Sequence, residues 1–301
     1  MKLSVISWNI RHLRKEKIEI HRKQVVKDLA DGHIVFLYEN KMDHRDNALM
    51  YDLLMEALGE AHGNSDDIKI DVLSPPVGTN EFVQVVYTSK RVTGPSSQHG
   101  QGHTIDIEVK KNTTWNQRLW DEGWHRLSRS YNDTVRSEIQ QQRLARGKGY
   151  RIPAIVDVVS TKPDATTTRI TIAAWHAPGP AKATAPSLFE AYCGVPTEID
   201  LLVGDFNYNP NTPFSPAKQV GKLNLHSVVG STTITEEAKP TSHTAGPDLI
   251  YYNSEKVTST GVYAGKALIG NVEVREADVA LGKALWDLSD HRPVVLTLKN
   301  L

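Results

Sequence analysis

The sequence predicts a single α/β domain in which a strand-rich core is layered with helices. LSVISW at 3–8 and HIVFLYE at 33–39 have the composition and length of strands. The stretches 16–30 and 47–61 instead place apolar residues at helical spacing. Strand, helix, strand and helix in this order are typical of a sheet covered by helices. No repeat or low-complexity linker divides the 301 residues, so we expect one domain over 1–301.

The rest of the chain is rich in further strand candidates. They are short apolar or alternating segments bounded by Pro, Gly and Ser: 68–73, 81–88, 103–109, 152–160, 169–175, 198–206, 247–253, 270–276 and 293–298. A turn is expected at Lys162–Thr168. The polar stretch 113–146, with three tryptophans, is either helix or insertion.

Composition and charge exclude several classes of protein. The 35 Lys and Arg residues balance 35 Asp and Glu residues, so no whole-molecule charge attracts nucleic acid, although a local basic face still could. No apolar run reaches the roughly 18–20 residues of a membrane helix. The single cysteine, Cys193, excludes an intrachain disulfide and favours a reducing compartment. No signal peptide is recognised. We therefore expect a cytoplasmic protein, or an effector delivered from the cell in mature form.

Polar side chains gather at the ends of the predicted strands. They are carboxylates, carboxamides and histidines: Asn9, Glu39, His176, Asp205, Asn207, Asp248, Asp290 and His291. Side chains at strand ends can converge on one rim of a sheet, where active sites commonly lie. Oxygen ligands suit Mg²⁺, Mn²⁺ or Ca²⁺, whereas the absence of a thiolate set or an HExxH pair makes zinc the weaker candidate.

Each of these residues also has an ordinary structural interpretation. Asn9 suits a turn or cap, and Glu39 could be the first exposed position after an apolar run. GDFN suits an Asp-containing turn, and a lone His176 is usually a hydrogen-bonded packing residue. The functional interpretation gains weight because all of them occur in one order along the chain.

That order of motifs resembles the endonuclease/exonuclease/phosphatase superfamily, which has the DNase I fold. The motifs span nearly the whole chain: SWNIR (7–11), LYENK (37–41), AWHAPG (174–179), LLVGDFNYNP (201–210), PDLIYY (247–252) and SDHRPVV (289–295). Segments 81–92 and 150–159 also look like strands of DNase I and of the nuclease subunit of cytolethal distending toxin. The chain departs from the pattern in having LYE where many members have glutamine before the glutamate, and in lacking the disulfides of secreted members.

The resemblance implies a fold and a role for each site residue. The fold would be a four-layer α/β sandwich of two packed mixed sheets flanked by helices. Asn9, Glu39 and Asp290 would bind the divalent metal, Mg²⁺ first, with Mn²⁺ and Ca²⁺ as alternatives. The catalytic set would be the residues around the scissile phosphate and their supports: His176, Asp205, Asn207, His291, Glu81 and Asp248. Arg151 and Lys41 would contact the phosphate backbone.

The resemblance implies metal-dependent phosphodiester hydrolysis, with a DNase I-like endonuclease acting on nucleic acid, DNA first, as the leading candidate. The Trp- and Arg-rich stretch 115–151 could stack bases or contact a backbone, or it could be an amphipathic helix whose tryptophans pack. A phosphoinositide phosphatase or a sphingomyelinase-type enzyme is the alternative, because the superfamily shares its catalytic residues. A binding protein without activity is a third class, against which the intact ligand and histidine set argues. The motifs leave DNA, RNA and phosphoinositide substrates open, together with the oligomeric state.

Overall fold

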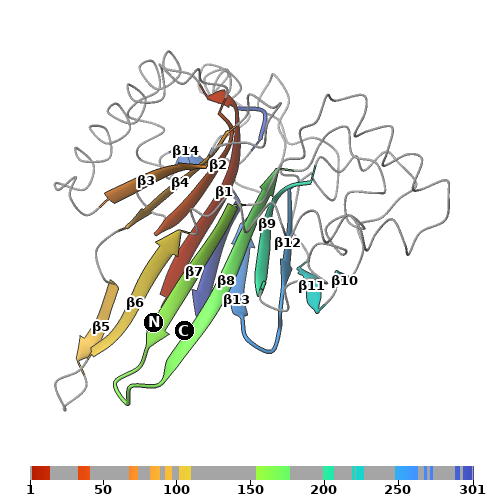
Figure 1. Ribbon diagram of the computed structural model, residues 1–301. Coiled ribbons are helices and arrows are strands. Elements are labelled where there is room, and N and C mark those ends of the chain that lie inside the picture. Colours follow the sequence, from red (N-terminus) through yellow and green to blue (C-terminus); the bar gives the residue numbers. More distant parts are fainter. Residues whose placement is uncertain are drawn as a thin grey trace.

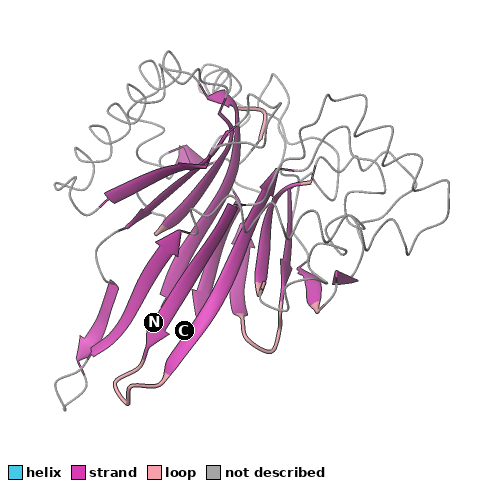
Figure 2. Cartoon of the chain, in the orientation of Figure 1, coloured by secondary structure: helices cyan, strands magenta, loops and turns pink. Residues whose placement is uncertain are grey.

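The computed structural model contains two large β-sheets that face one another (Figure 1). The structure describes residues 2–13, 33–40, 68–73, 82–88, 92–96, 102–109, 154–176, 199–206, 219–220, 222–226, 248–263, 268–269, 272–273, 289–291, 294–299 and 301. Among these residues there are strands and loops, and no helix long and apolar enough to cross a bilayer (Figure 2).

The first sheet has six strands in the order β13-β16-β1-β2-β4-β3. Their bounds are β1 Lys2–Leu13, β2 Ile34–Asn40, β3 Ile68–Leu73, β4 Phe82–Thr88, β13 Thr258–Tyr263 and β16 Val294–Lys299. β1 and β2 are parallel, and the other pairs are antiparallel, so the sheet is mixed.

The second sheet has eight strands in the order β10-β11-β12-β9-β8-β7-β6-β5. Their bounds are β5 Val92–Ser96, β6 Gly102–Val109, β7 Ala154–Thr161, β8 Thr167–His176, β9 Leu201–Asp205, β10 Gln219–Val220, β11 Leu223–His226 and β12 Asp248–Tyr252. Only β8 and β9 pair in parallel, so this sheet is mixed as well. A separate two-stranded ribbon joins β14 (Leu268–Ile269) and β15 (Val272–Glu273).

A shared hydrophobic core lies between the two large sheets. One cluster of buried side chains takes alternate residues from β1, β2 and β16 of the first sheet, such as Val5 and Phe36, and from β7, β8 and β9 of the second, such as Ile172 and Val203. Because strand side chains alternate between faces, these residues identify the inward row of each strand. The predicted pair of packed mixed sheets is therefore confirmed.

The outer faces of the central strands are buried too. Ile6, Trp8 and Ile10 belong to the other face of β1, and each is at most 3% exposed. Burial on both faces is what a four-layer arrangement requires. The helices predicted at 16–30 and 47–61 lie outside the described residues, as does the stretch 113–146.

Most predicted strands are present, within a few residues of their expected ends. The expected turn at Lys162–Thr168 joins β7 to β8, and Ala165 adopts a left-handed φ of 66° there. The prediction was wrong in two respects: β5 and β13 were not anticipated, nor was the β10–β11 hairpin. Of the strand expected at 270–276, the structure describes only residues 272–273, which form β15.

The side chain and backbone of His33 form hydrogen bonds with Ser4 at the start of the parallel β1–β2 pair. The backbone N–H of Ser4 donates to His33 Nδ1 at 3.1 Å, and the backbone N–H of His33 donates to the Ser4 carbonyl at 3.1 Å. Nδ1 must be unprotonated to accept, and burial lowers the pKa of His33 below its ordinary value.

This geometry predicts that His33 contributes stability above about pH 6.5, its unfolded pKa, and that this contribution is lost as pH falls through the lower folded pKa. We expect His33→Asn, whose side-chain oxygen accepts at every pH, to remove about 1 kcal/mol of the acid-induced loss in unfolding free energy. Urea unfolding of both proteins at pH 7.5 and pH 5 measures the difference. Equal acid losses in the two proteins would contradict the assignment.

Candidate active site

Four strands carry a polar residue at the same end of the space between the sheets: β8 and β9 end in theirs, β12 begins with its own, and β1 carries its own four residues before its end. Each continues the inward row of its strand: Asn9 on β1, His176 on β8, Asp205 on β9 and Asp248 on β12. The strand register places His176 and Asp248 opposite Asp205 on its two sides. All four are at most 4% exposed. Because side chains alternate along each strand, the inward rows that fill the core with apolar side chains also place these four polar groups close together.

Asn9 joins the two sheets through its side-chain amide. Its Nδ2 donates to Glu39 Oε1 at 3.0 Å and to Asp205 Oδ2 at 2.8 Å. Its Oδ1 accepts from the backbone N–H of Arg11 at 2.9 Å. Two carboxylates from different sheets are therefore held next to one another by a single amide.

The backbone bends sharply where these residues lie. Arg11 and Glu39 have left-handed φ values of 48° and 59°, and the β1–β2 register shifts beyond Asn9. A non-glycine residue costs about 1–3 kcal/mol in such a region, and strain of this kind clusters at functional sites. At Glu39 the bend brings the carboxylate beside Asn9, while the residue before it, Tyr38, remains in the inward row.

Two histidines flank one carboxylate oxygen. His176 Nε2 lies 3.6 Å from Asp205 Oδ2, and His291 Nε2 lies 3.8 Å from the same atom. His176 Nε2 is also 3.8 Å from Glu39 Oε1. His176 ends β8 of the second sheet, and His291 precedes β16 of the first sheet, yet both imidazoles lie beside Asp205.

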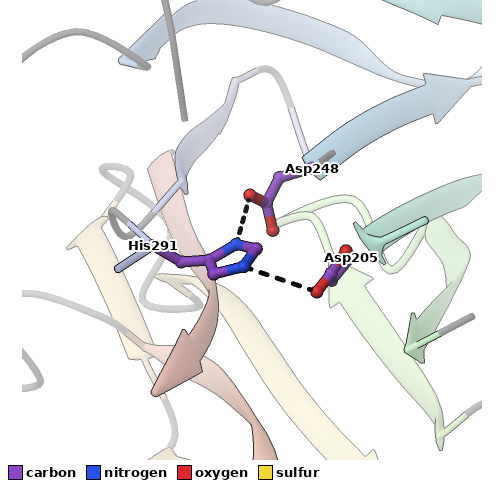
Figure 3. Close-up of side chains that lie close together, drawn as sticks. All are labelled: Asp205, Asp248 and His291. Atoms are coloured by element: carbon purple, nitrogen blue, oxygen red, sulfur yellow. Dashed lines mark hydrogen bonds and ion pairs between the residues drawn. The ribbon is translucent and has the colours of Figure 1, made fainter. Parts of the chain in front are cut away.

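His291 is paired with Asp248 on its other ring nitrogen. His291 Nδ1 and Asp248 Oδ2 are 2.9 Å apart (Figure 3). Burial lowers the pKa of His291, but the carboxylates of Asp248, Asp205 and Asp290 outweigh it and raise the pKa to about 10. His291 is therefore an imidazolium at neutral pH, with one N–H directed at Asp248 and the other facing the site.

Hydrogen bonds between side chains and backbone groups fix the segment that carries His291 to β1 at Trp8 and Asn9. The Ser289 hydroxyl donates to the Asn9 carbonyl at 2.6 Å and accepts from the backbone N–H of His291 at 3.0 Å. The indole N–H of Trp8 donates to the His291 carbonyl at 2.9 Å. The position of His291 is consequently tied to that of Asn9.

The residues present fit a divalent cation. The carboxylates of Glu39, Asp205 and Asp248 lie beside the imidazoles of His176 and His291, and the charge of Asp290 also acts on His291. Glu39 is 19% exposed, so a cation can reach its oxygens from solvent. Hard carboxylate and carboxamide donors are the ligands that Mg²⁺, Mn²⁺ and Ca²⁺ take. Asp205, Asp248 and His291 also offer one ligand atom each within 4.8 Å of one another.

The structure brings together six of the predicted site residues through printed contacts: Asn9, Glu39, His176, Asp205, Asp248 and His291. Asp290 precedes His291 in the chain, and its charge raises the pKa of that histidine. The predicted residues Asn207, Glu81, Lys41 and Arg151 lie outside the described residues. Sequence reasoning assigned no role to Trp8 and Ser289, although both stand inside quoted motifs. It also assigned no role to Tyr38. Many members of the family that the motifs resemble have glutamine at this position, and that difference was the signal that could have pointed to Tyr38.

Gly204 lets β9 approach β8 closely just before Asp205. Its φ is 154°, and a Cβ built on it would lie 1.8 Å from the backbone oxygen of Trp175, which cannot move aside. We expect Gly204→Ala to lower the unfolding free energy by about 3 kcal/mol, the upper end of what overpacking costs. Urea unfolding checks this value, and a variant within about 0.5 kcal/mol of wild type would contradict the close contact.

No family profile and no curated protein matches the chain. Among solved structures, it is similar to an endonuclease/exonuclease/phosphatase from Beutenbergia cavernae, at 16% identity and a TM-score of 0.51, over 99% of this chain and 71% of that one. A family protein of the same description from Leptotrichia buccalis matches at 12% identity and a TM-score of 0.50, over 99% of both chains.

A third similar structure is ANGEL2, described as a 2′,3′-cyclic phosphatase, at 12% identity and a TM-score of 0.50, over 99% of this chain and 95% of that one. The chain therefore has the fold of the endonuclease/exonuclease/phosphatase superfamily, as its motifs implied.

Proposed function

We propose that this chain is a divalent-metal-dependent phosphodiesterase that hydrolyses the backbone of nucleic acid, DNA first. The observation that carries the proposal is the pair of imidazoles, His176 and His291, on either side of one Asp205 carboxylate oxygen. A tetrahedral phosphate between two such groups would find a donor on each side and a carboxylate beside the attacking water.

The charge state of the site suits a phosphodiester. Imidazolium at His291, maintained by Asp248, donates to a phosphate oxygen and stabilises negative charge that develops there. Asp205, 1% exposed and held by Asn9, orients the attacking water and accepts its proton. His176, at the end of β8, would contact the same phosphate. Glu81 is the proposed support of His176, and Asn207 is a further proposed phosphate contact.

Asn9, Glu39 and Asp290 are the residues that would hold the metal. A bound divalent cation supplies charge neutralisation and orients the phosphate. The amide nitrogen of Asn9 holds Glu39 and Asp205 at a set spacing, and Asn9 would have to turn its amide oxygen, which accepts from the Arg11 N–H, toward the metal to bind it. Arg151, with a planar donor fork, and Lys41 would contact the backbone beyond the scissile bond.

The experiment that tests the proposal offers several phosphate esters in parallel. Supercoiled plasmid, single-stranded RNA, an oligonucleotide with a 2′,3′-cyclic phosphate end and phosphoinositide vesicles are each incubated with Mg²⁺ and with EDTA. We expect Mg²⁺-dependent loss of supercoiled plasmid. Intact plasmid with phosphate released from phosphoinositide would replace the nuclease proposal with the phosphatase alternative. Turnover confined to the cyclic end would place the substrate at RNA termini.

Backbone contact by Arg151 makes a separate prediction about salt and sequence. Arg151→Gln should reduce cleavage of all sequences to a similar extent, because a phosphate contact reads no base. It should also reduce the slope of log affinity against log salt concentration by about 1. Filter binding at several salt concentrations, without Mg²⁺, measures the slope. An unchanged slope, or a loss limited to some sequences, would remove Arg151 from the backbone contact.

A further inference from the structure

Tyr38 is a fully buried residue of the site to which no role has been given. It ends the inward row of β2 and lies opposite Asn9 in the β1–β2 register. Its hydroxyl is 3.0 Å from Ser7 Oγ on the neighbouring strand, and Ser7 is itself 2% exposed. The hydrogen bond fixes the phenol relative to β1, the strand that carries Asn9.

The other side of Tyr38 meets His176. The two ring centroids are 5.9 Å apart, with a tilt of 52° between the planes. Such a tilted arrangement lies within the range of favourable aromatic pairs. His176 Nε2 lies 3.6 Å from Asp205 and 3.8 Å from Glu39. Packing against Tyr38 restricts the orientation of the ring in addition to these polar contacts.

We propose that Tyr38, anchored by Ser7, is a positioning residue that holds the imidazole of His176 beside Asp205. The inference rests on the proposed function for its catalytic consequence, but not for the contact itself. Rotation of the His176 ring would move Nε2 away from the phosphate position, and misplacement by about 1 Å can cost on the order of 10²-fold in rate. Tyr38 is buried behind His176 and acts through it.

Two variants separate the ring from its anchor, and a third controls for packing. Tyr38→Leu removes the ring, and Tyr38→Phe keeps the ring but removes the hydrogen bond to Ser7. Phe36→Leu is the matched control, because Phe36 is 0% exposed on the same inward row of β2, one repeat deeper in the core. It loses an equivalent aromatic group without touching the described contact with His176.

The first readout needs no substrate. NMR of the protein with labelled histidine follows the His176 ring signals, assigned by their loss in His176→Ala. We expect Tyr38→Leu to shift these signals while Phe36→Leu leaves them in place. Unchanged His176 signals in folded Tyr38→Leu, or an equal shift in Phe36→Leu, would overturn the proposal.

The second readout is kinetic. We expect Tyr38→Leu to lower kcat about tenfold or more with KM within about twofold, since the ring positions a catalytic group without binding substrate. Tyr38→Phe should lose about threefold in kcat. An equal kcat loss in Phe36→Leu, or unchanged kcat in Tyr38→Leu, would overturn the positioning role.

Two further outcomes are a Tyr38→Leu variant that does not fold and a wild-type protein without activity. Should Tyr38→Leu not fold, Tyr38→Phe decides the matter by the same signals: a shift of the His176 ring supports the anchor at Ser7, and no shift overturns it. If wild-type protein hydrolyses no phosphate ester, the proposed function fails, and the NMR comparison alone then supports or overturns the contact-based positioning of His176.

Discussion

Glu39→Gln is expected to lose about 10²- to 10³-fold in turnover at limiting Mg²⁺ while remaining folded. The amide keeps the length of the side chain and an oxygen that can accept from Asn9 Nδ2, now 3.0 Å from Glu39 Oε1. It removes the negative charge that binds a hard cation, and a metal supplies several kcal/mol of transition-state stabilisation, at about 1.4 kcal/mol per factor of ten. Steady-state rates over a range of Mg²⁺ concentrations measure the loss.

Excess Mg²⁺ should recover part of the activity of Glu39→Gln, because weaker metal binding is the cause. Glu255→Gln is the matched control: it removes the same charge from an exposed turn next to β12, at the end of the strand remote from Asp248. We expect no change in that variant. Wild-type turnover of Glu39→Gln at limiting Mg²⁺ would exclude Glu39 from the metal site.

Replacement of either histidine by alanine is expected to reduce turnover by about 10²- to 10⁴-fold, the usual size of an acid–base or charge-stabilising contribution. His176 and His291 face the same Asp205 oxygen, at 3.6 and 3.8 Å, and would act on one phosphate. The double variant should therefore lose less than the product of the two single losses, because groups that act as a unit are non-additive.

His103→Ala serves as the control for the histidine variants. His103 lies on β6 and contacts the Ser160 hydroxyl at 2.7 Å, away from the described site, so its loss should leave turnover unchanged. Single-turnover rates of the four proteins against wild type complete the cycle. Strictly multiplicative losses would show that His176 and His291 act independently, against the shared-phosphate arrangement.

Much of the fold was predictable because alternation and apolar runs report which strands are buried. The strands that escaped prediction lie at sheet edges or are very short. β5 contains Gly94 and Pro95, which edge strands tolerate and central strands do not. β13 contains Gly261, and its register with β16 shifts between Thr260 and Val262, so its pattern is not a simple alternation.

The site was predictable where its residues follow from the alternation of side chains along a strand. Polar residues that end an inward apolar row, such as His176 and Asp205, can be recognised from sequence alone. Left-handed backbone at Glu39, a residue without the usual preference for it, could not be. The contact between Tyr38 and His176 joins strands of different sheets, and no local pattern encodes a distance of that kind.

Diffraction from crystals grown with Mn²⁺ and a non-hydrolysable phosphodiester tests the central claim most directly, since the claim is that these strand ends form one metal and phosphate site. We predict an anomalous peak in contact with a Glu39 carboxylate oxygen, and the phosphorus atom between Nε2 of His176 and Nε2 of His291. A metal held elsewhere, with Glu39 still bonded only to protein, would contradict the account, as would a phosphate that contacts neither imidazole.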